Sequence, residues 1–429
     1  MKNIENIQKI KEETNRQIST LAGEENSFTM LFARAPFEMN KDDFIGYEQR
    51  YQCIRNFLDT TNQLVYECLR EGKHPELYRL IFFGKDKEYV DEQRRWYSNN
   101  PNSAPYFFRT DEPIPGVIAE IQCPGSGLAQ LGILEQAWNK ILNKNVWPDW
   151  KNIVINNIHA LTKKNIPRIL YLPKSSCTLD ASLFYRSLDN KGIIFVNPLE
   201  KGIEYKNSIN KNILEKVDMI RVHSHGFMRS WPAFWEAVQL AKKRQLVIDV
   251  PPAIIYNMKL SMALPFWSYT RNYYNDEIRQ LFPLTRVIKD GGTIQFEGKN
   301  IKYEDYLKLP DKKRNHIIKS SSGTSELDDG GKGVFSLKRT TRKKCAAMFK
   351  KIILEYHYGE RWIIQEEHNQ KYSYSYLNEN EQIKNKDGYA RFSGFYGPDG
   401  IITRRVLFKN YYKVGGSAST VCAPVKIDD

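Results

Sequence analysis

The segment from residue 316 to residue 337 constrains this chain most, because two apolar strands flank a loop rich in serine and glycine. It reads HIIKSSSGTSELDDGGKGVFSL, and its first strand carries Lys319. Serine and glycine have little side-chain bulk, so a ligand can approach the backbone N–H groups of such a loop closely. Nucleotide phosphates need those donors and a fixed cation. The segment therefore predicts a phosphate site, and a surface hairpin with one exposed lysine is the alternative.

The loop differs from two familiar phosphate-binding loops. A P-loop needs GxxxxGK[ST] leading directly into a helix, and no such run occurs in this segment. A dinucleotide-binding fingerprint is also absent. A phosphate site here therefore depends on Lys319 and on the backbone of residues 320–333.

The elements that follow the loop make the chain resemble the ATP-grasp family, in which a nucleotide lies between two β-rich lobes. The sequence predicts a helix over 340–356, a strand over 361–368, and a hairpin over 389–408 that turns at Gly397–Gly400. In that family one lysine on the strand before the loop holds the phosphates, another lies upstream, and a later strand ends in a hinge that contacts adenine. The resemblance implies ATP-binding roles for Lys259, Lys319, Ser320, Gly323, Gly331, Gly333, Gln365 and Glu366.

The assignment of Lys259 and those of the downstream arginines have structural alternatives. Lys259 also fits a surface lysine at the start of a helix. Downstream, the family has a strand pair with arginines and then a Gly-Gly segment. Arg391, Arg404 and Arg405 match the strand pair, and Gly415–Ser417 match the segment. The resemblance implies that Arg391 and Arg405 bind phosphate or a substrate carboxylate, whereas an exposed cross-strand charge is the alternative.

Residues 109–122, RTDEPIPGVIAEIQ, offer hard oxygen ligands upstream of the lysine loop. Asp111 and Glu120 are expected on two strands joined by a turn, with Gln122 on the same face as Glu120. Magnesium between ATP phosphates takes one or two carboxylates besides phosphate and water. Arg109 shares the face of Asp111 and is placed to clamp a transferring phosphate. The alternative is an exposed hairpin with ordinary charges.

This order of motifs resembles the circularly permuted ATP-grasp ligases, typified by glutathionylspermidine synthase. An ordinary ATP-grasp chain carries its magnesium ligands after the Gly-Gly segment, where this chain has only CAPVKIDD left. In the permuted group an R-x-D … E-x-N set stands ahead of the lysine loop. The resemblance implies catalytic roles for Arg109 and Lys319 and Mg²⁺ ligands at Asp111, Glu120 and Gln122. Gln122 departs from the asparagine of the pattern, and its longer arm changes the geometry.

Strand and helix alternate between residues 168 and 251. Apolar runs at 168–173, 192–198, 219–225 and 245–251 predict buried strands, which indicates a small parallel α/β domain. Polar helices are expected over 1–25 and 41–72. The expected fold is thus mixed α+β and α/β, a permuted ATP-grasp. Its domains are residues 1–165 (a helical region and the metal-ligand strands), 166–255 (the small α/β domain) and 256–429 (the nucleotide-binding lobes).

Composition excludes several other classes of protein. The chain has 429 residues and 41% hydrophobic residues, so it is globular rather than disordered. No stretch is apolar enough to span a membrane, and the N-terminus lacks a signal-peptide core, so we expect a cytoplasmic protein without a membrane partner. The six cysteines form no CxxC pair, which disfavours a zinc site. The net charge of +14 is dispersed, so nucleic acid is not the expected partner.

Together these features predict an ATP- and Mg²⁺-dependent ligase that joins a peptide or small-metabolite carboxylate to an amine through an acyl phosphate. Cys123 is expected to be a half-buried thiol and not a nucleophile, and His223 and His225, which share a strand face, are expected to be structural. A non-catalytic nucleotide-binding regulatory protein on the same scaffold is one alternative. A nucleic-acid-binding protein, whose affinity would fall steeply with salt, is another.

Overall fold

The computed structural model describes most of the chain. The described residues are 2–100, 104–123, 125–143, 148–172, 178–196, 211–222, 234–321, 333–412, 414 and 417–427.

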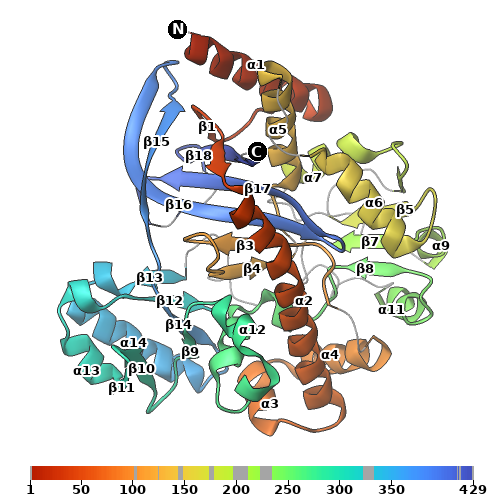
Figure 1. Cartoon of the computed structure of the whole chain (residues 1–429). Helices are drawn as coiled ribbons and strands as arrows, with labels where there is room; N and C mark the ends of the chain where they lie inside the picture. The colour runs from red at the N-terminus through yellow and green to blue at the C-terminus, as the bar shows by residue number, and fades with distance from the viewer. Residues whose placement is uncertain are drawn as a thin grey trace.

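The largest unit is a mixed sheet of eight strands that crosses the molecule (Figure 1). Its order is β15, β1, β18, β17, β16, β3 and β4, with β2 paired to β18, so strands from both ends of the chain share it. β16 and β17 form the predicted hairpin, and the positive φ of Gly400 explains the glycine at its turn. The strands are β1 Leu31–Ala33, β2 Phe37–Met39, β3 Phe108–Glu112, β4 Glu120–Gln122, β15 Lys371–Leu377, β16 Ile383–Gly397, β17 Gly400–Lys409 and β18 Val421–Ile427.

Helices cover parts of both faces of this sheet. On one face Tyr47 of α2 packs with Phe392 and Val406. On the other face α1 and α5 bury apolar side chains against Leu407 and Cys422. The side chains of a strand alternate between faces, so neighbouring residues of β3, β16 and β17 serve different surroundings. The helices of the first part of the chain are α1 Lys2–Ala22, α2 Lys41–Arg70, α3 Pro75–Phe82, α4 Lys87–Asn99, α5 Leu128–Leu142 and α6 Trp150–Thr162.

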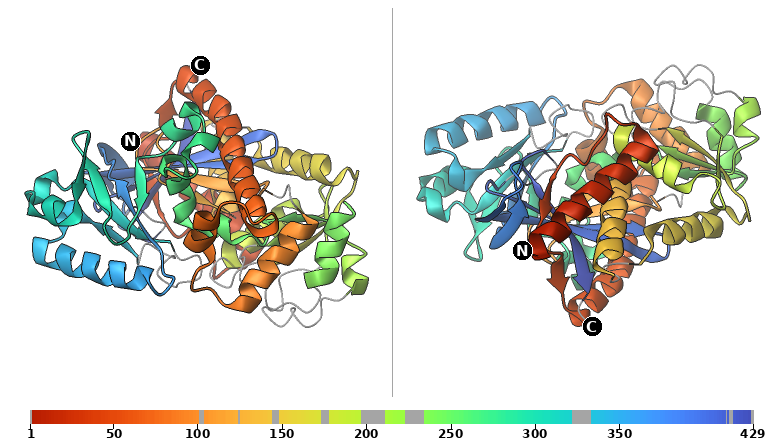
Figure 2. Two further views of the ribbon diagram at one scale, coloured as in Figure 1. Left: turned by 90° about the horizontal axis from the view of Figure 1, so that it is seen from below. Right: turned by 90° about the horizontal axis from the view of Figure 1, so that it is seen from above.

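A separate antiparallel sheet in the order β13, β12, β14, β9 forms a smaller lobe beside the large sheet (Figure 2). Its outer face carries Ile318 and Ile364, which pack under α13 and α14. The opposite face carries Lys319. The lobe contains β9 Thr285–Val287, β10 Thr293–Phe296, β11 Lys299–Lys302, α13 Tyr303–Lys308, η6 Asp311–Lys313, β12 His316–Ser320, β13 Val334–Ser336, η8 Leu337–Arg339, α14 Arg342–Tyr356 and β14 Trp362–Glu366.

The middle of the chain forms a four-stranded sheet in the order β6, β5, β7, β8, and every described pairing in it is parallel. Arg221 and Asp249 join two of its strands through a buried ion pair of 2.8 Å. The parallel α/β arrangement expected for this part is therefore confirmed. Its elements are β5 Arg168–Leu172, α7 Thr178–Leu188, β6 Ile194–Phe195, α9 Lys211–Leu214, β7 Met219–Val222, α11 Phe234–Lys242 and β8 Val247–Asp249.

A run of short helices connects the middle of the chain to the smaller lobe. They are η3 Ile254–Asn257, η4 Lys259–Phe266, η5 Arg271–Tyr273 and α12 Asp276–Gln280. Lys259 begins η4, so it does lie at the start of a helix, although the helix is of the 3₁₀ type.

The structure adds elements that the sequence pattern did not indicate, notably α3, α4, α6, β15 and β18. The expected domain boundaries at 165 and 255 stay predictions. The large sheet joins β3 and β4 of the first expected domain to β15, β16, β17 and β18 of the third. Among the described helices, none is both long and apolar enough to cross a membrane.

Candidate functional site

Lys319 lies on the face of the smaller lobe that is turned toward the large sheet. Its cross-strand partners are Val334 and Ile363, which share that face. Its ammonium donates to the carbonyl oxygen of Ala119 at 2.8 Å and to Oε1 of Gln365 at 2.7 Å. Ala119 directly precedes β4, so this one side chain bridges the two sheets.

The surroundings of Lys319 disfavour its charged form. Burial lowers the pKa of Lys319 to about 8, Lys259 adds to the shift, and Glu120 and Asp111 oppose it. These contributions show that the two lysines and two carboxylates lie within electrostatic reach of one another. The sequence placed them in three separate segments, and the fold brings them to one site.

Gln365 is held on both sides of its amide. Its Nε2 donates to Oγ1 of Thr285 at 2.9 Å, and the Thr285 hydroxyl in turn donates to the carbonyl of Pro283. Because that hydroxyl accepts from the amide nitrogen, the Gln365 carbonyl is turned toward Lys319. The Gln365 side chain therefore orients the Lys319 ammonium. The resemblance to ATP-grasp chains implies a different role for Gln365, in binding ATP at the hinge that contacts adenine. Glu366 is exposed, with Oε2 3.6 Å from Nε2 of His368.

Asp111 on β3 is the centre of a buried hydrogen-bond network. Arg109 binds it with both prongs of the guanidinium, at 3.0 and 2.9 Å, and Ser393 donates to it at 2.8 Å. Arg391 lies 3.3 Å away. Burial raises the pKa of Asp111, but the two arginines and Ser393 outweigh burial and hold that pKa below its usual range.

Glu120 and Gln122 complete the upstream set on β4. Glu120 is the cross-strand partner of Asp111, and Gln122 is the partner of Arg109. Lys259 approaches Oε1 of Glu120 at 3.5 Å. Gln122 turns its amide nitrogen toward Asp111 at 3.3 Å and Glu120 at 3.5 Å. Its carbonyl oxygen faces a cation only if the amide rotates.

Two further arginines extend the site along the same face of the large sheet. Arg405 is the cross-strand partner of Ser393 and is 5% exposed. Its Nε has no hydrogen-bond partner in the described part of the chain, and the Nε of Arg391 has none either. Burial, and then Arg109, lower the pKa of Arg405 to about 10. A buried guanidinium beside like charges favours an anion as its ligand.

Gly127 makes room for Arg405. A Cβ at this position would lie 2.6 Å from Nη1 of Arg405, and the φ of +95° is itself unfavourable for other residues. The N–H groups of Gly127, Ala129 and Gln130 donate to Asp180, so the start of α5 is already capped. No carboxylate of this loop neutralises Arg405 in the described structure.

A cavity of about 510 Å³ lies between the smaller lobe and the large sheet, and its lining includes none of the predicted site residues. Glu367 lines it and hydrogen-bonds Ser336, whose cross-strand partner is Ile317, two residues before Lys319. Burial raises the pKa of Glu367. The volume suits a small organic ligand. The lining also includes Ile114, Asn315, Lys338, Arg339, His368, Asn369, Gln370, Lys371 and Tyr389.

The remaining predicted residues are placed as follows. Ser320 lies on the outer face of β12, and its N–H bonds the carbonyl of Gly333 at the base of the loop. Gly323 and Gly331 lie outside the described residues, as do His223 and His225. Cys123 is fully buried, and burial raises its pKa, so it is a poor nucleophile.

Sequence reasoning missed Ser393, Thr285, Ser321 and Glu367. Ser321 accepts a hydrogen bond from the N–H of Leu260 at 2.5 Å, which fastens η4 to the strand before the loop. Ser393 is separated from Asp111 by most of the chain. No local spacing indicates such partners, because each depends on a strand pairing or a packing contact between distant segments.

No protein-family model matches this chain, and no curated protein matches it in sequence. Among solved structures, it is similar to a glutathione synthetase-like effector from Globodera pallida in its apo form. That match has a TM-score of 0.56 at 9% identity and covers 99% of this chain and 97% of the other. Identity this low concerns the fold alone. The mixed α/β fold is shown, and it is similar to the fold of this glutathione synthetase-like structure.

Proposed function

We propose that this chain is an ATP- and Mg²⁺-dependent ligase that joins a carboxylate to an amine. One observation carries the proposal: Lys319 and Lys259, from the smaller lobe and η4, meet Glu120 and Asp111 of the large sheet. Cationic groups for phosphates and carboxylates for a cation thus face each other across two sheets. The likeness to a glutathione synthetase-like structure supports the fold that this reaction uses. The circular permutation belongs to the proposal.

The residues have distinct roles in the proposed reaction. Lys319 and Lys259 bind the phosphates, and the cavity beside Glu367 takes the nucleoside. Glu120, with Asp111 and Gln122 beside it, presents oxygen atoms to Mg²⁺, which offsets charge on the phosphates. Arg109 holds the phosphoryl group in line with the attacking carboxylate. Gln365 keeps the Lys319 ammonium in position.

The proposed reaction has two steps. A substrate carboxylate oxygen attacks the γ-phosphorus of ATP, so ADP leaves and an acyl phosphate forms. The amine then attacks the acyl carbon, phosphate leaves, and the nitrogen loses a proton. No protein nucleophile is needed. Positioning and electrostatics by the five cationic side chains at this site supply the catalysis.

The substrate is proposed to be a peptide or small metabolite that carries an anionic group. Arg405 and Arg391 are buried on the face that holds Asp111, and both have an unsatisfied Nε. A carboxylate fits a guanidinium through two parallel hydrogen bonds. These arginines are therefore assigned to a carboxylate or to the phosphate of the intermediate.

The test is phosphate and ADP release by the full chain in the presence of ATP, Mg²⁺ and panels of carboxylates and amines. We expect release that requires both a carboxylate and an amine, with Lys319→Met inactive. Calorimetry provides the independent measurement of ATP binding. A protein that binds no ATP in Mg²⁺ contradicts the proposal altogether. A protein that ATP stabilises but that never turns over supports the regulatory alternative.

A further inference from the structure

The two carboxylates at the candidate cation site differ in how they are satisfied. Asp111 receives Arg109 and Ser393 on Oδ1, and Arg109, Gln122 and Arg391 on Oδ2, all within 3.3 Å. A carboxylate has about four lone-pair directions. Asp111 can therefore contact a cation only by giving up an existing bond.

Glu120 is held far less tightly. Its contacts within the described residues are Lys259 at 3.5 Å and the amide of Gln122 at 3.5 Å, and its side chain is 29% exposed. Both distances lie at or beyond the limit of a good hydrogen bond. Glu120 is thus the carboxylate that can change partners without breaking a network.

Lys259 is the partner that changes. It is 9% exposed, and the neighbouring N–H of Leu260 is tied to Ser321 just before the phosphate loop. A buried ammonium needs an anion, and Glu120 is one anion that pairs with it in this structure. Nucleotide phosphates carry more charge than one carboxylate and would attract the same ammonium more strongly.

We propose that Lys259 and a divalent cation compete for Glu120. Without nucleotide, Lys259 pairs with Glu120. Bound nucleotide attracts the Lys259 ammonium away, so that Glu120 can then bind a divalent cation. Nucleotide and cation then help each other to bind by more than their direct contact, because each removes the competitor of the other. The inference rests on the proposed function. It concerns the order in which nucleotide and cation bind at that site and the coupling between the two binding events. It can be tested without measuring turnover, since it predicts how the protein binds a divalent cation in the absence of nucleotide.

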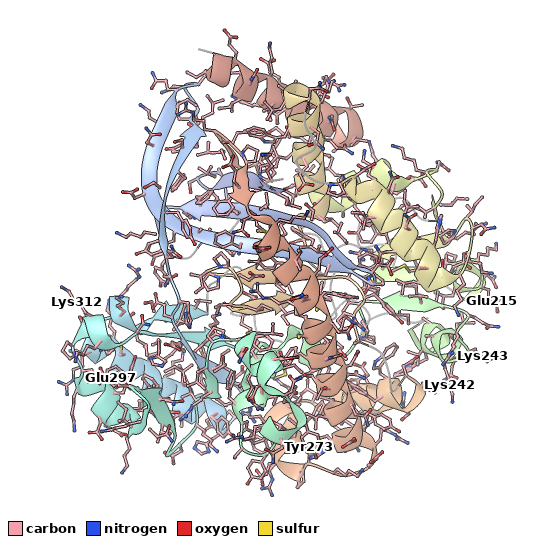
Figure 3. The ribbon with its side chains drawn as sticks, in the orientation of Figure 1. Glu215, Lys242, Lys243, Tyr273, Glu297 and Lys312 are labelled. Atoms are coloured by element: carbon pink, nitrogen blue, oxygen red, sulfur yellow. The ribbon has the colours of Figure 1, made fainter. Side chains whose placement is uncertain are left out.

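The test measures Mn²⁺ binding to the full chain by the electron paramagnetic resonance signal of free Mn²⁺, without nucleotide. Lys259→Met removes the competing ammonium, so Mn²⁺ should bind roughly five- to tenfold more tightly than to the wild type. Lys312→Met is the matched control, because Lys312 lies exposed on the surface of the smaller lobe (Figure 3). It should leave Mn²⁺ affinity unchanged. Lys259→Arg keeps the charge and should bind Mn²⁺ as weakly as the wild type.

A second measurement adds a non-hydrolysable ATP analogue. In the wild type the analogue should raise Mn²⁺ affinity by a larger factor than in Lys259→Met, since the variant has no competitor left to remove. Glu120→Gln should abolish the tight Mn²⁺ site in the Lys259→Met background. Thermal unfolding checks that each variant is folded. The inference is overturned if Lys259→Met binds Mn²⁺ no more tightly than Lys312→Met, or binds none. Failure of ATP binding alone would instead remove the proposed ligase.

Discussion

Each face of the large sheet carries acidic and basic side chains, but these side chains are paired differently on the two faces. Consecutive residues supply both faces: Asp111 and Glu112 on β3, and Arg404 and Arg405 on β17. On the face beneath α2, Glu112 accepts hydrogen bonds from Tyr47, Thr110 and Gly116 and pairs with Arg404 at 3.4 Å. The Arg404 guanidinium also lies 3.1 Å from the ring centre of Tyr47. On the opposite face no carboxylate of the described residues pairs with Arg405 in this way.

This difference separates a structural network from a site. Arg404 and Arg405 are both buried, but within the described part of the chain Arg404 pairs with Glu112 and Arg405 forms no ion pair. A buried charge without a partner destabilises a fold, so it persists where a ligand supplies the missing charge. The network on the face beneath α2, here called the closed face, holds α2 to the sheet. The face that carries Asp111 and Arg405, here called the open face, holds the candidate site, although α1 and α5 cover other parts of it.

Disrupting the Glu112–Arg404 pair on the closed face should have the largest effect on stability. Arg404→Met leaves Glu112 buried without its cation, so the free energy of unfolding should fall by about 3–5 kcal/mol. Urea unfolding followed by circular dichroism measures this. The double variant Glu112→Gln with Arg404→Met should recover much of the loss, because both charges are then gone. Equal stability of Arg404→Met and the wild type would show that the network is not structural.

The same change on the open face should spare stability and affect the substrate. Arg405→Met removes an unpaired buried charge, so its free energy of unfolding should equal or exceed that of the wild type. In the release assay KM for the carboxylate substrate should rise by about tenfold to a hundredfold. Arg405→Lys should restore it only in part. A loss of stability comparable to that of Arg404→Met would erase the contrast between the faces.

The candidate site should also titrate at mildly alkaline pH, through Lys319 of the smaller lobe, and the closed face of the large sheet should not. With a pKa of about 8, Lys319 loses its proton above that pH, so nucleotide affinity should fall by up to tenfold per pH unit between pH 8 and 9.5. Calorimetry at several pH values measures the decline, and Lys319→Arg should flatten it. Burial raises the pKa of Tyr47 to about 12, so the closed network stays constant over this range.

The depressed pKa of Lys319 also has a consequence for stability. Between about pH 8 and the ordinary lysine value of 10.5, the unfolded chain binds a proton that the folded chain has released. The contribution of Lys319 to stability therefore rises with pH across this window. The free energy of unfolding of the wild type minus that of Lys319→Met, measured in urea, should therefore be higher at pH 9.5 than at pH 7.5. A constant difference would place the pKa of Lys319 outside the window.

Gln122 should contribute least. Its amide nitrogen makes two long contacts, so Gln122→Ala should change the free energy of unfolding by under about 0.5 kcal/mol. Mn²⁺ affinity should fall by no more than about threefold. A larger loss of Mn²⁺ binding would show that the amide rotates and offers its carbonyl to the cation.

Much of the fold could be predicted from the sequence because its signals are local. The alternation in residues 168–251 gave the parallel strands, and Pro-Asp-Gly gave the turn between β16 and β17. The strands β15 and β18 were missed, since their partners lie elsewhere in the sheet. For the candidate site, residue types and spacing, together with the resemblance to ATP-grasp chains, indicated Lys319, Lys259, Arg109, Asp111 and Glu120. The hydrogen bond from Lys319 to Gln365 could not be predicted, because it requires the register of β12 against β14.

The sequence by itself determined that Asp111 and Glu112, like Arg404 and Arg405, point to opposite sides, since the two-residue period of a strand is a local property. Only the tertiary structure decided which side became a site. It placed α2 over Glu112 and Arg404 and brought the lysines of η4 and β12 toward Asp111 and Glu120. The physical reason is that a charge becomes structural or functional through the partner that reaches it, and here those partners come from distant parts of the chain.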